Sequence, residues 1–481
     1  MVALGPITSW NPGHGPVTTW TASPASRAAM AQAGVDALPA TFQQANHLRS
    51  AYYGRLFGRQ MPRLIVVAWE IPGVCDIATM TDAINIHVRR HDTYHSSFDV
   101  QDGVIVRRTI ESPELIDFTA TSVGELDEEQ IREHVMATTP GTLEWDCFSF
   151  GIIQKADHFT FYASIDHLHG DGMSAGLILL DLQLAYNSLV QGQPVALGEI
   201  TGYRDYSLRQ QEKIAAMRLE SSEIQDWITF AQGTEGAWPS FPLPLGDTHA
   251  SAAGRFVTVE LMDEAQTEAF DTACRAAGAR FSGGVLACAG LAEHRLTGIE
   301  TFHGFTPSDT RTPGADAMSV GWFASLFPVT VPVANGDFAS AARAAQTSFD
   351  TSKHLAAVPF ERVLELGSID ELGIKMPTKS SMMVSYMDFR KMPCGELWGQ
   401  TNFGIYGDNL SHGGINMWIN RHVDRTTITV SFPDNAEARE SVQRYIGVVG
   451  RVFTEAARST ENWIEQISAH ANSSLAESGS R

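Results

Sequence analysis

The chain has 481 residues, of which 43% are hydrophobic and 19% are charged, so it exceeds one ordinary core and two domains or two large halves are expected. Its 55 acidic residues outnumber the 34 basic ones, and the net charge of -21 repels nucleic-acid phosphates and anionic lipid headgroups. This charge balance argues against a nucleic-acid partner.

The two ends of the chain lack a regular pattern. Residues 1–40 are rich in Pro, Ala, Ser and Thr and predict an irregular N-terminal arm, while residues 469–481 predict a disordered tail. The start, MVALGPITSW, lacks the basic flank and apolar core of a secretion signal, and no run approaches the roughly 18 apolar residues of a membrane span. We expect a cytoplasmic protein, either free or peripheral at the inner face of the membrane.

The cysteine pattern agrees with that compartment. Five cysteines are widely spaced and form no CxxC pair: Cys75, Cys147, Cys274, Cys288 and Cys394. An odd number without the spacing of metal ligands predicts reduced and mostly buried thiols.

Strands and helices are predicted to alternate between residues 41 and 235. The strand-like run RLIVVAWEI precedes an amphipathic helix over 76–92, whose apolar residues recur at spacings of three and four. A hairpin follows, in which SSFDV and VIVRRTI flank a Gln-Asp-Gly turn.

The next two predicted strands, FSFGII and HFTFYASID, lead to a histidine. Alternate residues from Phe159 to Ile165 share one apolar face, and His167 continues that phase. Gly170 and Gly172 supply a turn, and residues 175–190 predict a mostly buried helix. His167 is therefore expected where a buried strand ends.

Residues 236–254 contain proline and glycine without a period and are the predicted linker. Residues 255–468 repeat the mixture seen in the first half: helices near 283–296 and 338–354, strand-like SLFPVTVPV and SSMMVSYMDF, the pair INMWIN and TTITVSF, and a final amphipathic helix. Both halves mix helices and strands, so the fold class is α/β or α+β.

The stretch IDHLHGDGMSAG, from Ile165 to Gly176, fits three kinds of active site. Read as GxSxG, it places Ser174 between glycines, as in a serine hydrolase. In such an enzyme the serine follows the strand almost at once. Here it stands seven residues beyond His167, where it is expected to cap a helix.

Read as HxHxD, the stretch offers three ligands of a metallohydrolase: His167, His169 and Asp171. That pattern normally continues with another histidine, but Gly172 stands there. A second candidate metal set has helical spacing: His87, His91 and His95. For this set we favour solvated histidines on an arginine-rich helix surface.

Read as HxxxDG, the stretch gives the motif of an acyltransferase: His167, Asp171 and Gly172. One histidine at a strand end can act as general base on an alcohol. Because a thioester donor is already activated, neither a nucleophilic serine nor a metal is required. Asp171 is then expected to fix the turn by pairing with an arginine. The alternative is a core histidine without a catalytic role.

Further segments resemble condensation domains. RRHDTYHSSF (89–98) is similar to their RHxxLRTxF segment and precedes DHLHGDG, as it does in those domains. In the second half, FTPSDTR is similar to their arginine-containing loop, and VGWFASLFPVTVPV to a strand with VGxFxN-like residues. From about LPATFQQANHLR to SFPDNAEARESVQRY, the chain resembles the mycobacterial polyketide-associated acyltransferases that acylate trehalose.

This resemblance implies a fold and an activity. Two chloramphenicol-acetyltransferase-like halves, residues 41–235 with the HxxxDG motif and 255–468, are expected to form a V-shaped pseudo-dimer around a central tunnel. The enzyme would move a long-chain or polyketide-derived acyl group from a thioester, on CoA or on a carrier protein or polyketide synthase, to a hydroxyl of trehalose or an acylated trehalose. A monomer is expected.

The resemblance also implies the site residues. His167 would be the catalytic base, while Asp171, Gly172 and Arg311 would be structural, with Arg311 as the partner of Asp171. No metal and no cofactor besides the acyl thioester co-substrate are expected. Two alternatives stay open: the metallohydrolase, and a catalytically idle condensation-like module that binds a carrier protein or a lipid.

The chain departs from condensation domains at three positions. Asp166 stands where they have the first histidine of HHxxxDG, His95 where they have an arginine, and Ser325 where they often have asparagine. For the tunnel, SLFPV and SSMMVSYM are expected to line an apolar donor side, and NMWINR (416–421) a polar and aromatic acceptor side.

Overall fold

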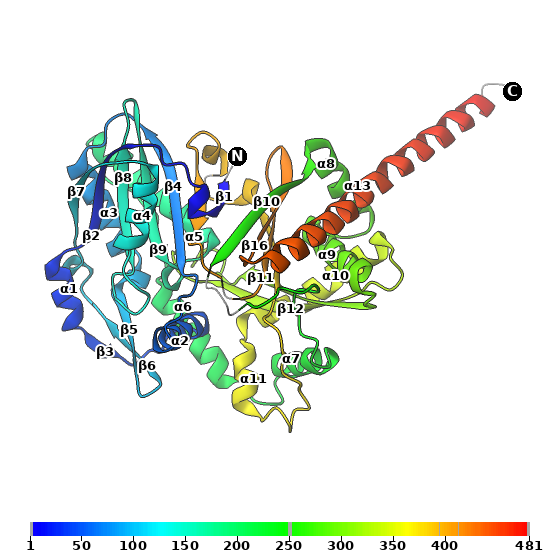
Figure 1. Cartoon of the computed structure of the whole chain (residues 1–481), viewed down its shortest axis with the longest axis horizontal. Coiled ribbons are helices and arrows are strands. Elements are labelled where there is room, and N and C mark those ends of the chain that lie inside the picture. Colours follow the sequence, from blue (N-terminus) through cyan, green and yellow to red (C-terminus); the bar gives the residue numbers. More distant parts are fainter. Residues whose placement is uncertain (1–2, 249–252, 394, 412, 479–481) are drawn as a thin grey trace.

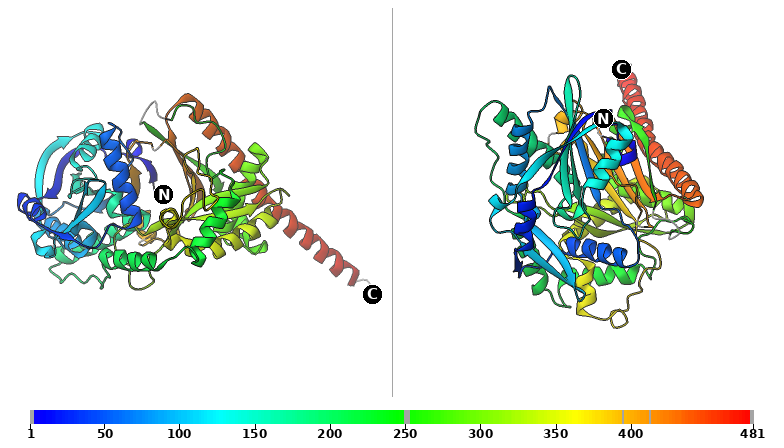
Figure 2. Two further views of the ribbon diagram at one scale, coloured as in Figure 1. Left: turned by 90° about the horizontal axis from the view of Figure 1, so that it is seen from below. Right: turned by 60° about the vertical axis from the view of Figure 1, so that its left-hand side comes forward.

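The computed structural model describes residues 3–248, 253–393, 395–411 and 413–478. Two halves, each a β-sheet with helices, meet at an angle like the arms of a V (Figures 1 and 2). The fold is mixed α/β, as the sequence predicts. Both sheets are open, and each buries an apolar face against helices.

The first half contains a seven-stranded sheet. Its strands are, in spatial order, β1 (Ala3–Pro6), β14 (Gly404–Gly407), β4 (Leu64–Pro72), β9 (His158–Asp166), β8 (Phe148–Gln154), β2 (Gly15–Ala22) and β7 (Phe118–Leu126). Helices α3 (Ile77–Arg90) and α5 (Gly172–Val190) cover one face, and α4 (Glu128–Thr138) covers the other. Alternating residues of β9 therefore enter two separate apolar clusters, with Phe161 in one and Tyr162 in the other.

The second half contains a six-stranded sheet. Its spatial order is β10 (Gly254–Asp263), β16 (Arg425–Pro433), β15 (Asn416–Arg421), β13 (Met383–Asp388), β11 (Thr301–Asp309) and β12 (Ala324–Pro332). One face packs against α8 (Glu264–Ala276), α9 (Phe281–Thr297), α10 (Phe338–Ser352) and α13 (Ala436–Ser478). Helix α13 continues beyond the body of the protein (Figure 1).

Smaller elements complete the two halves. A three-stranded sheet consists of β3 (Gly34–Asp36), β6 (Val104–Thr109) and β5 (Ser96–Gln101), and β5 and β6 form the predicted hairpin. Six helices join the larger elements: α1 (Pro24–Ala31), α2 (Phe42–Leu56), α6 (Tyr203–Ala216), α7 (Ser222–Gly233), α11 (Phe360–Leu366) and α12 (Gly395–Trp398).

The second half contributes a strand to the sheet of the first half, which the sequence did not predict. After β13 the chain crosses over, and β14 pairs with β1 and β4 in the sheet of the first half. Trp398, Phe403 and Ile405 of this crossover are buried in the core of the first half. Residues 255–468 are therefore not one self-contained half. Helix α7 differs in the same way, because Ile224 and Trp227 belong to the core of the second half, although 41–235 was assigned to the first.

The predicted irregular arm over residues 1–40 is wrong for the residues that the structure describes. Strands β1 and β2 belong to the first sheet, and Trp10, Val17 and Trp20 are buried. The single proline and the threonines of GPVTTWTA obscure the apolar alternation of β2 in the sequence. The predicted disordered tail is helical over residues 469–478, as part of α13, whereas 479–481 lie outside the described residues.

One described helix, α5, is long and apolar enough to cross a membrane by length and composition. However, 56% of its apolar window is buried inside the protein, where it packs beside α3 on the first sheet. Core helices pass the same test, so we assign α5 to the core. Four cysteines are free and buried, as predicted, and Cys394 lies outside the described residues.

Candidate active site

His167 lies where β9 ends, as predicted. Asp166 is the last residue of β9 and caps the short turn His167–His169 by accepting a hydrogen bond from the Leu168 amide. The His167 amide donates to the Arg63 carbonyl, at 2.6 Å, which fixes the turn to the strand beside it. The side chain of His167 is half-buried, while Ile165, two residues earlier, is fully buried.

The imidazole of His167 faces the second half. Its ring lies against the indole of Trp322, with 3.8 Å between the ring centroids. Trp322 belongs to the loop between β11 and β12, so the two halves meet at this contact. The Nδ1 atom of His167 is buried and has no hydrogen-bond partner among the described residues, which leaves Nε2 as the atom that can meet a substrate.

Burial, and after it the charge of His47, lower the pKa of His167 to about 4. The ring is therefore neutral at physiological pH and carries a free lone pair. This is the protonation state that a general base needs.

His47 is a site residue that the sequence analysis missed. It lies on α2, and its ring centroid is 6.4 Å from that of His167 and 5.4 Å from that of Trp322. Its Nε2 lies 2.7 Å from Asp166 Oδ1, and both side chains are buried. No local pattern marks His47, because 119 residues separate it from Asp166.

Asp166 collects several donors. Besides His47, its carboxylate accepts hydrogen bonds from Thr142 Oγ1, at 2.6 Å, and Arg63 Nη1, at 3.3 Å. Burial alone would raise the pKa of Asp166, but His47, Arg63 and Thr142 outweigh it and hold the pKa well below its ordinary value. Asp166 stands where condensation domains have the first histidine of HHxxxDG. It holds the imidazole of His47, from α2, beside His167.

Asp171 pairs with Arg311, as predicted. Arg311 Nη1 donates to Asp171 Oδ2 at 3.0 Å, and Nη2 donates to Oδ1 at 3.1 Å. The Phe323 and Ala324 amides also donate to Asp171, and the guanidinium lies 4.1 Å from the Phe323 ring centroid. Burial would raise the pKa of Asp171, but Arg311 outweighs it and lowers the pKa. Asp171 thus joins α5 of the first half to the loop that carries Trp322.

The structure gives no steric reason for glycine at Gly172, to which the sequence assigned a structural role. A Cβ atom there would meet only Met387 Sδ, at 3.9 Å, which is an ordinary contact. The crowded glycine of this turn is Gly170, where a Cβ atom would lie 2.7 Å from Ile165 Cδ1.

Ser174 does not form a nucleophile elbow. It lies in the first turn of α5, fully buried, and its Oγ contacts Asp171 Oδ1 at 2.9 Å and the Gly321 carbonyl at 3.0 Å. These contacts occupy the hydroxyl in the junction between the halves, and none of the described histidines forms a hydrogen bond with it.

The metal ligands of the HxHxD reading do not come together. His169 is buried between Tyr94 and Phe148, its Nδ1 lies 3.3 Å from Thr93 Oγ1, and burial lowers its pKa to about 4. Among the described residues, the one group with metal-like spacing is different: His87, His91 and Asp181.

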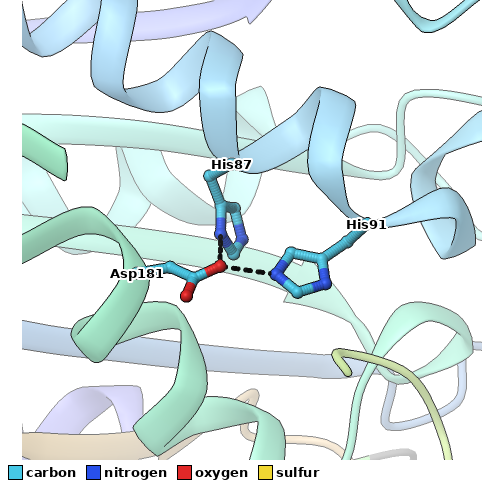
Figure 3. A group of neighbouring side chains, drawn as sticks. All are labelled: His87, His91 and Asp181. Atoms are coloured by element: carbon cyan, nitrogen blue, oxygen red, sulfur yellow. Dashed lines mark hydrogen bonds and ion pairs between the residues drawn. The ribbon is translucent and has the colours of Figure 1, made fainter. Parts of the chain in front are cut away.

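That group is buried, so the expectation that His87, His91 and His95 are solvated is wrong. The histidine face of α3 packs against α5, where Asp181 Oδ2 lies 3.5 Å from His87 Nδ1 and 2.7 Å from His91 Nε2 (Figure 3). His95 follows in a separate turn, with its Nε2 3.0 Å from the Val88 carbonyl.

The candidate ligand atoms of this group are already engaged in hydrogen bonds and an ion pair, so the group does not fit a metal cation. His91 Nδ1 accepts a hydrogen bond from the Val320 amide, so its Nε2 carries the hydrogen and donates to Asp181. The guanidinium of Arg90 occupies the same carboxylate oxygen, with Nε at 3.1 Å. The group therefore ties the Trp322 loop to the first half.

Comparison with known proteins places this arrangement in a family. The model of the condensation domain family matches residues 64–373. Acyltransferase PapA3 of Mycobacterium tuberculosis is 43% identical over 95% of this chain and 98% of its own length. For PapA1 of the same species, a 2'-acyl-2-O-sulfo-trehalose (hydroxy)phthioceranyltransferase, the identity is 44% over 94% of this chain and 88% of PapA1.

A third relative is known both as a sequence and as a solved structure. Trehalose-2-sulfate acyltransferase PapA2 of Mycobacterium bovis is 43% identical over 96% of this chain and 98% of its own length. A solved structure of PapA2 acyl transferase superposes with a TM-score of 0.90, at 43% identity, over 95% of this chain and 99% of that one. The chain belongs to the condensation domain family and, within it, to the Pap acyltransferases.

Proposed function

We propose that the protein transfers a long-chain or polyketide-derived acyl group from a thioester to a hydroxyl of trehalose or an acylated trehalose, with His167 as general base. The observation that carries the proposal is the half-buried imidazole of His167, which has a depressed pKa and lies against Trp322 at the junction of the halves. PapA1 and PapA2 are named for sulfated trehalose acceptors, which supports a trehalose-type substrate.

The reaction uses His167 twice. Its Nε2 accepts the proton of the sugar hydroxyl while the hydroxyl oxygen attacks the thioester carbonyl carbon. When the tetrahedral intermediate collapses, the carbon–sulfur bond breaks, and His167 returns the proton to the departing thiolate. Because the thioester supplies the activation, the proposal includes no metal and no further cofactor. The enzyme would act as a monomer in the cytoplasm, where the acyl thioester is available.

The surroundings of His167 suit a lipid donor and a sugar acceptor. Met387 of β13 lies beside Gly172 and offers an apolar surface to an acyl chain, in the segment expected to line the donor side. Trp322 offers a flat aromatic face beside the base, onto which a sugar ring can stack. Trp418, from the acceptor segment expected from the sequence, is half-buried and stacks on Phe256.

A competition assay tests the acceptor class. Purified protein is given palmitoyl-CoA with trehalose, with trehalose 2-sulfate, or with an aminoacyl amine in parallel, and the products are identified by mass spectrometry. We expect a sugar ester and no amide. Amide formation without any sugar ester would overturn the proposal in favour of a peptide-forming condensation enzyme. Binding of palmitoyl-CoA without formation of an ester or an amide would favour the idle module.

A further inference from the structure

The C-terminal end of α2 exposes a group of large apolar side chains. Tyr53, Leu56 and Phe57 are 52%, 60% and 73% exposed. Leu56 ends the helix and Phe57 follows as its C-cap residue, so all three lie in the last turn and its cap. Single exposed apolar residues are common on protein surfaces, but three large ones within five positions form a patch. We call residues 49–59 the α2 tip.

A defined backbone motif presents these side chains. Helix α2 ends in a Schellman motif, in which the Arg59 amide donates to the Gly54 carbonyl at 2.7 Å and the Gly58 amide donates to the Arg55 carbonyl at 3.3 Å. Gly58 has a φ of +64°, the left-handed backbone that this motif requires. The exposed apolar side chains are therefore held at an ordered helix end.

Cations accompany the apolar side chains. The segment between Asp36 and Glu70 contains four arginines and no acidic residue, in a chain with a net charge of -21. Three of these arginines belong to the α2 tip and are exposed: Arg49, Arg55 and Arg59. None of the three forms an ion pair with another described residue, and the one side-chain hydrogen bond among them joins the first to Asn46. The tip thus carries unpaired positive charge beside an apolar patch.

At an anionic surface, the charge of the tip outweighs the net charge of the chain. The Debye length at physiological ionic strength is about 8 Å, so carboxylates farther away are largely screened. Glu361 bonds to Asn46, which lies about 16 Å along the helix axis from Phe57. Each arginine near an anionic bilayer raises partitioning about fivefold, so the three arginines together contribute about a hundredfold.

The α2 tip borders a groove of about 990 Å³. The lining includes Arg55 and Arg59 of the tip, and also Arg63 and Thr142, whose side chains bond to Asp166. The groove therefore joins the tip to the network beside His167. Four carboxylates also line the groove: Glu129, Glu133, Glu144 and Asp408. They balance the arginines there, so an anionic surface is attracted to the tip rather than to the groove.

We propose that the α2 tip binds the surface of an anionic lipid bilayer, with Leu56 and Phe57 inserted among the headgroups and the arginines beside lipid phosphates. Such binding strengthens with the apolar area that is buried and with the attraction of cations to anionic lipids, and the tip supplies both. The choice of a bilayer over a protein partner rests on the proposed function, because a sugar ester with a long acyl chain partitions into bilayers.

Vesicle binding tests the proposal. The full-length protein is mixed with sucrose-loaded vesicles of phosphatidylcholine, or of phosphatidylcholine and phosphatidylglycerol in equal amounts, and the bound fraction is measured by sedimentation. The wild type should bind the mixed vesicles more strongly and lose that preference in high salt. Absence of binding to both kinds of vesicle would overturn the proposal and assign the tip to a protein partner.

Reversal of two cations tests the electrostatic contribution. Arg55→Glu/Arg59→Glu should lower partitioning onto the mixed vesicles by about thirtyfold or more, at about fivefold for each arginine lost. The matched control is Arg343→Glu/Arg444→Glu, on exposed positions of α10 and α13, which makes the same change in net charge. An equal loss in both double variants would contradict the proposal, because the net charge rather than the tip would then set the binding.

Removal of the apolar side chains tests insertion. Leu56→Ser/Phe57→Ser should lower partitioning by about tenfold or more, and the melting temperature should stay near that of the wild type because both side chains are exposed. Val74→Ser/Val423→Ser is the control, since these valines are equally exposed outside the tip. Binding that is unchanged in Leu56→Ser/Phe57→Ser, or equally weakened in the control, would refute insertion at the tip.

The binding assay needs no acyl transfer, so its failure is distinct from a failure of the proposed function. Sugar esters formed by a protein that binds neither kind of vesicle would overturn this inference alone. Sedimentation velocity tests a second copy of this chain as the occupant of the tip. A wild-type dimer that becomes a monomer in Leu56→Ser/Phe57→Ser would also overturn the inference, whereas a monomeric wild type that binds the mixed vesicles supports it.

Discussion

Asp166 and Asp171 lie on either side of His167, and their partners show what each end of the motif does. Both carboxylates are buried and each accepts several hydrogen bonds. Among the described residues, Asp166 bonds within the first half, to the side chains of His47, Arg63 and Thr142 and to the Leu168 amide. Asp171 bonds chiefly to the second half, where Arg311 and the amides before and at the start of β12 reach it.

One network therefore acts on the catalytic base, and the other holds the two halves together. The Asp166 network sets the charge around His167, because it holds His47 beside the base. The Asp171 network holds the loop of Trp322, and with it the junction of the halves. Substitutions at the two ends should therefore fail in different ways, one mainly in rate and pH profile, the other mainly in stability.

The largest effect is expected at the residue between the two networks. His167→Ala should lower acyl transfer by roughly 10² to 10⁴, the usual contribution of a general base, while the melting temperature stays near that of the wild type. Steady-state transfer to trehalose and thermal unfolding are measured on the same preparation. Ser174→Ala is the comparison, and loss of activity there with an active His167→Ala variant would contradict the assignment of the base.

Asp171→Ala should act on stability. It leaves the buried Arg311 without its carboxylate, and breaking a buried ion pair in this way costs roughly 3 to 5 kcal/mol. We expect a lower free energy of unfolding in urea. The double variant Asp171→Ala/Arg311→Met should recover part of the loss, because no unpaired buried charge remains. An Asp171→Ala protein that is as stable as the wild type but inactive would assign Asp171 to the chemistry instead.

His47→Gln should act mainly on pH dependence. His47 is one of the groups that lower the pKa of His167, so its removal should raise that pKa from about 4 towards its ordinary value. Because His167 must be neutral to accept a proton, the acidic limb of the kcat/KM profile should move to higher pH. Activity near pH 8 should fall less than near pH 6. A uniform loss at every pH would show that His47 has only a packing role.

The sequence predicted those parts of the site that depend on a local period. The alternation along β9 correctly placed His167 at the end of a buried row, and the hairpin of β5 and β6 followed from its turn residues. The pairing of Asp171 with Arg311 was available only from family resemblance, because 140 residues separate the two side chains. Periodicity carries no information over that separation.

The missed features depend on packing between distant elements. His47 faces the site only because α2 packs beside the turn after β9, and no pattern in NHLR indicates this. Strand β14 was missed because GIYG is short and rich in glycine, although Trp398 and Phe403 near it are buried. His87 and His91 were assigned to solvent from their arginine neighbours, but their partner Asp181 lies on another helix.

The smallest effect, and the last prediction, concerns the two glycines that flank Asp171. Gly172 begins α5 with ordinary helical backbone, and a Cβ atom there would contact only Met387 Sδ, at 3.9 Å. Gly172→Ala should therefore change the free energy of unfolding by about 0.5 kcal/mol or less, because alanine is also the better helix former.

Gly170→Ala is the matched control. Its Cβ atom would lie 2.7 Å from Ile165 Cδ1 and 3.2 Å from Ser174 Cβ, so it should destabilise the protein by about 1 to 3 kcal/mol. Urea unfolding of both variants checks the order. A strongly destabilised Gly172→Ala would restore the structural role that the sequence assigned to Gly172. Unchanged stability with lost transfer would instead mean that substrate approaches the backbone there, and the first turn of α5 would then belong to the reaction centre as well as to the junction of the halves.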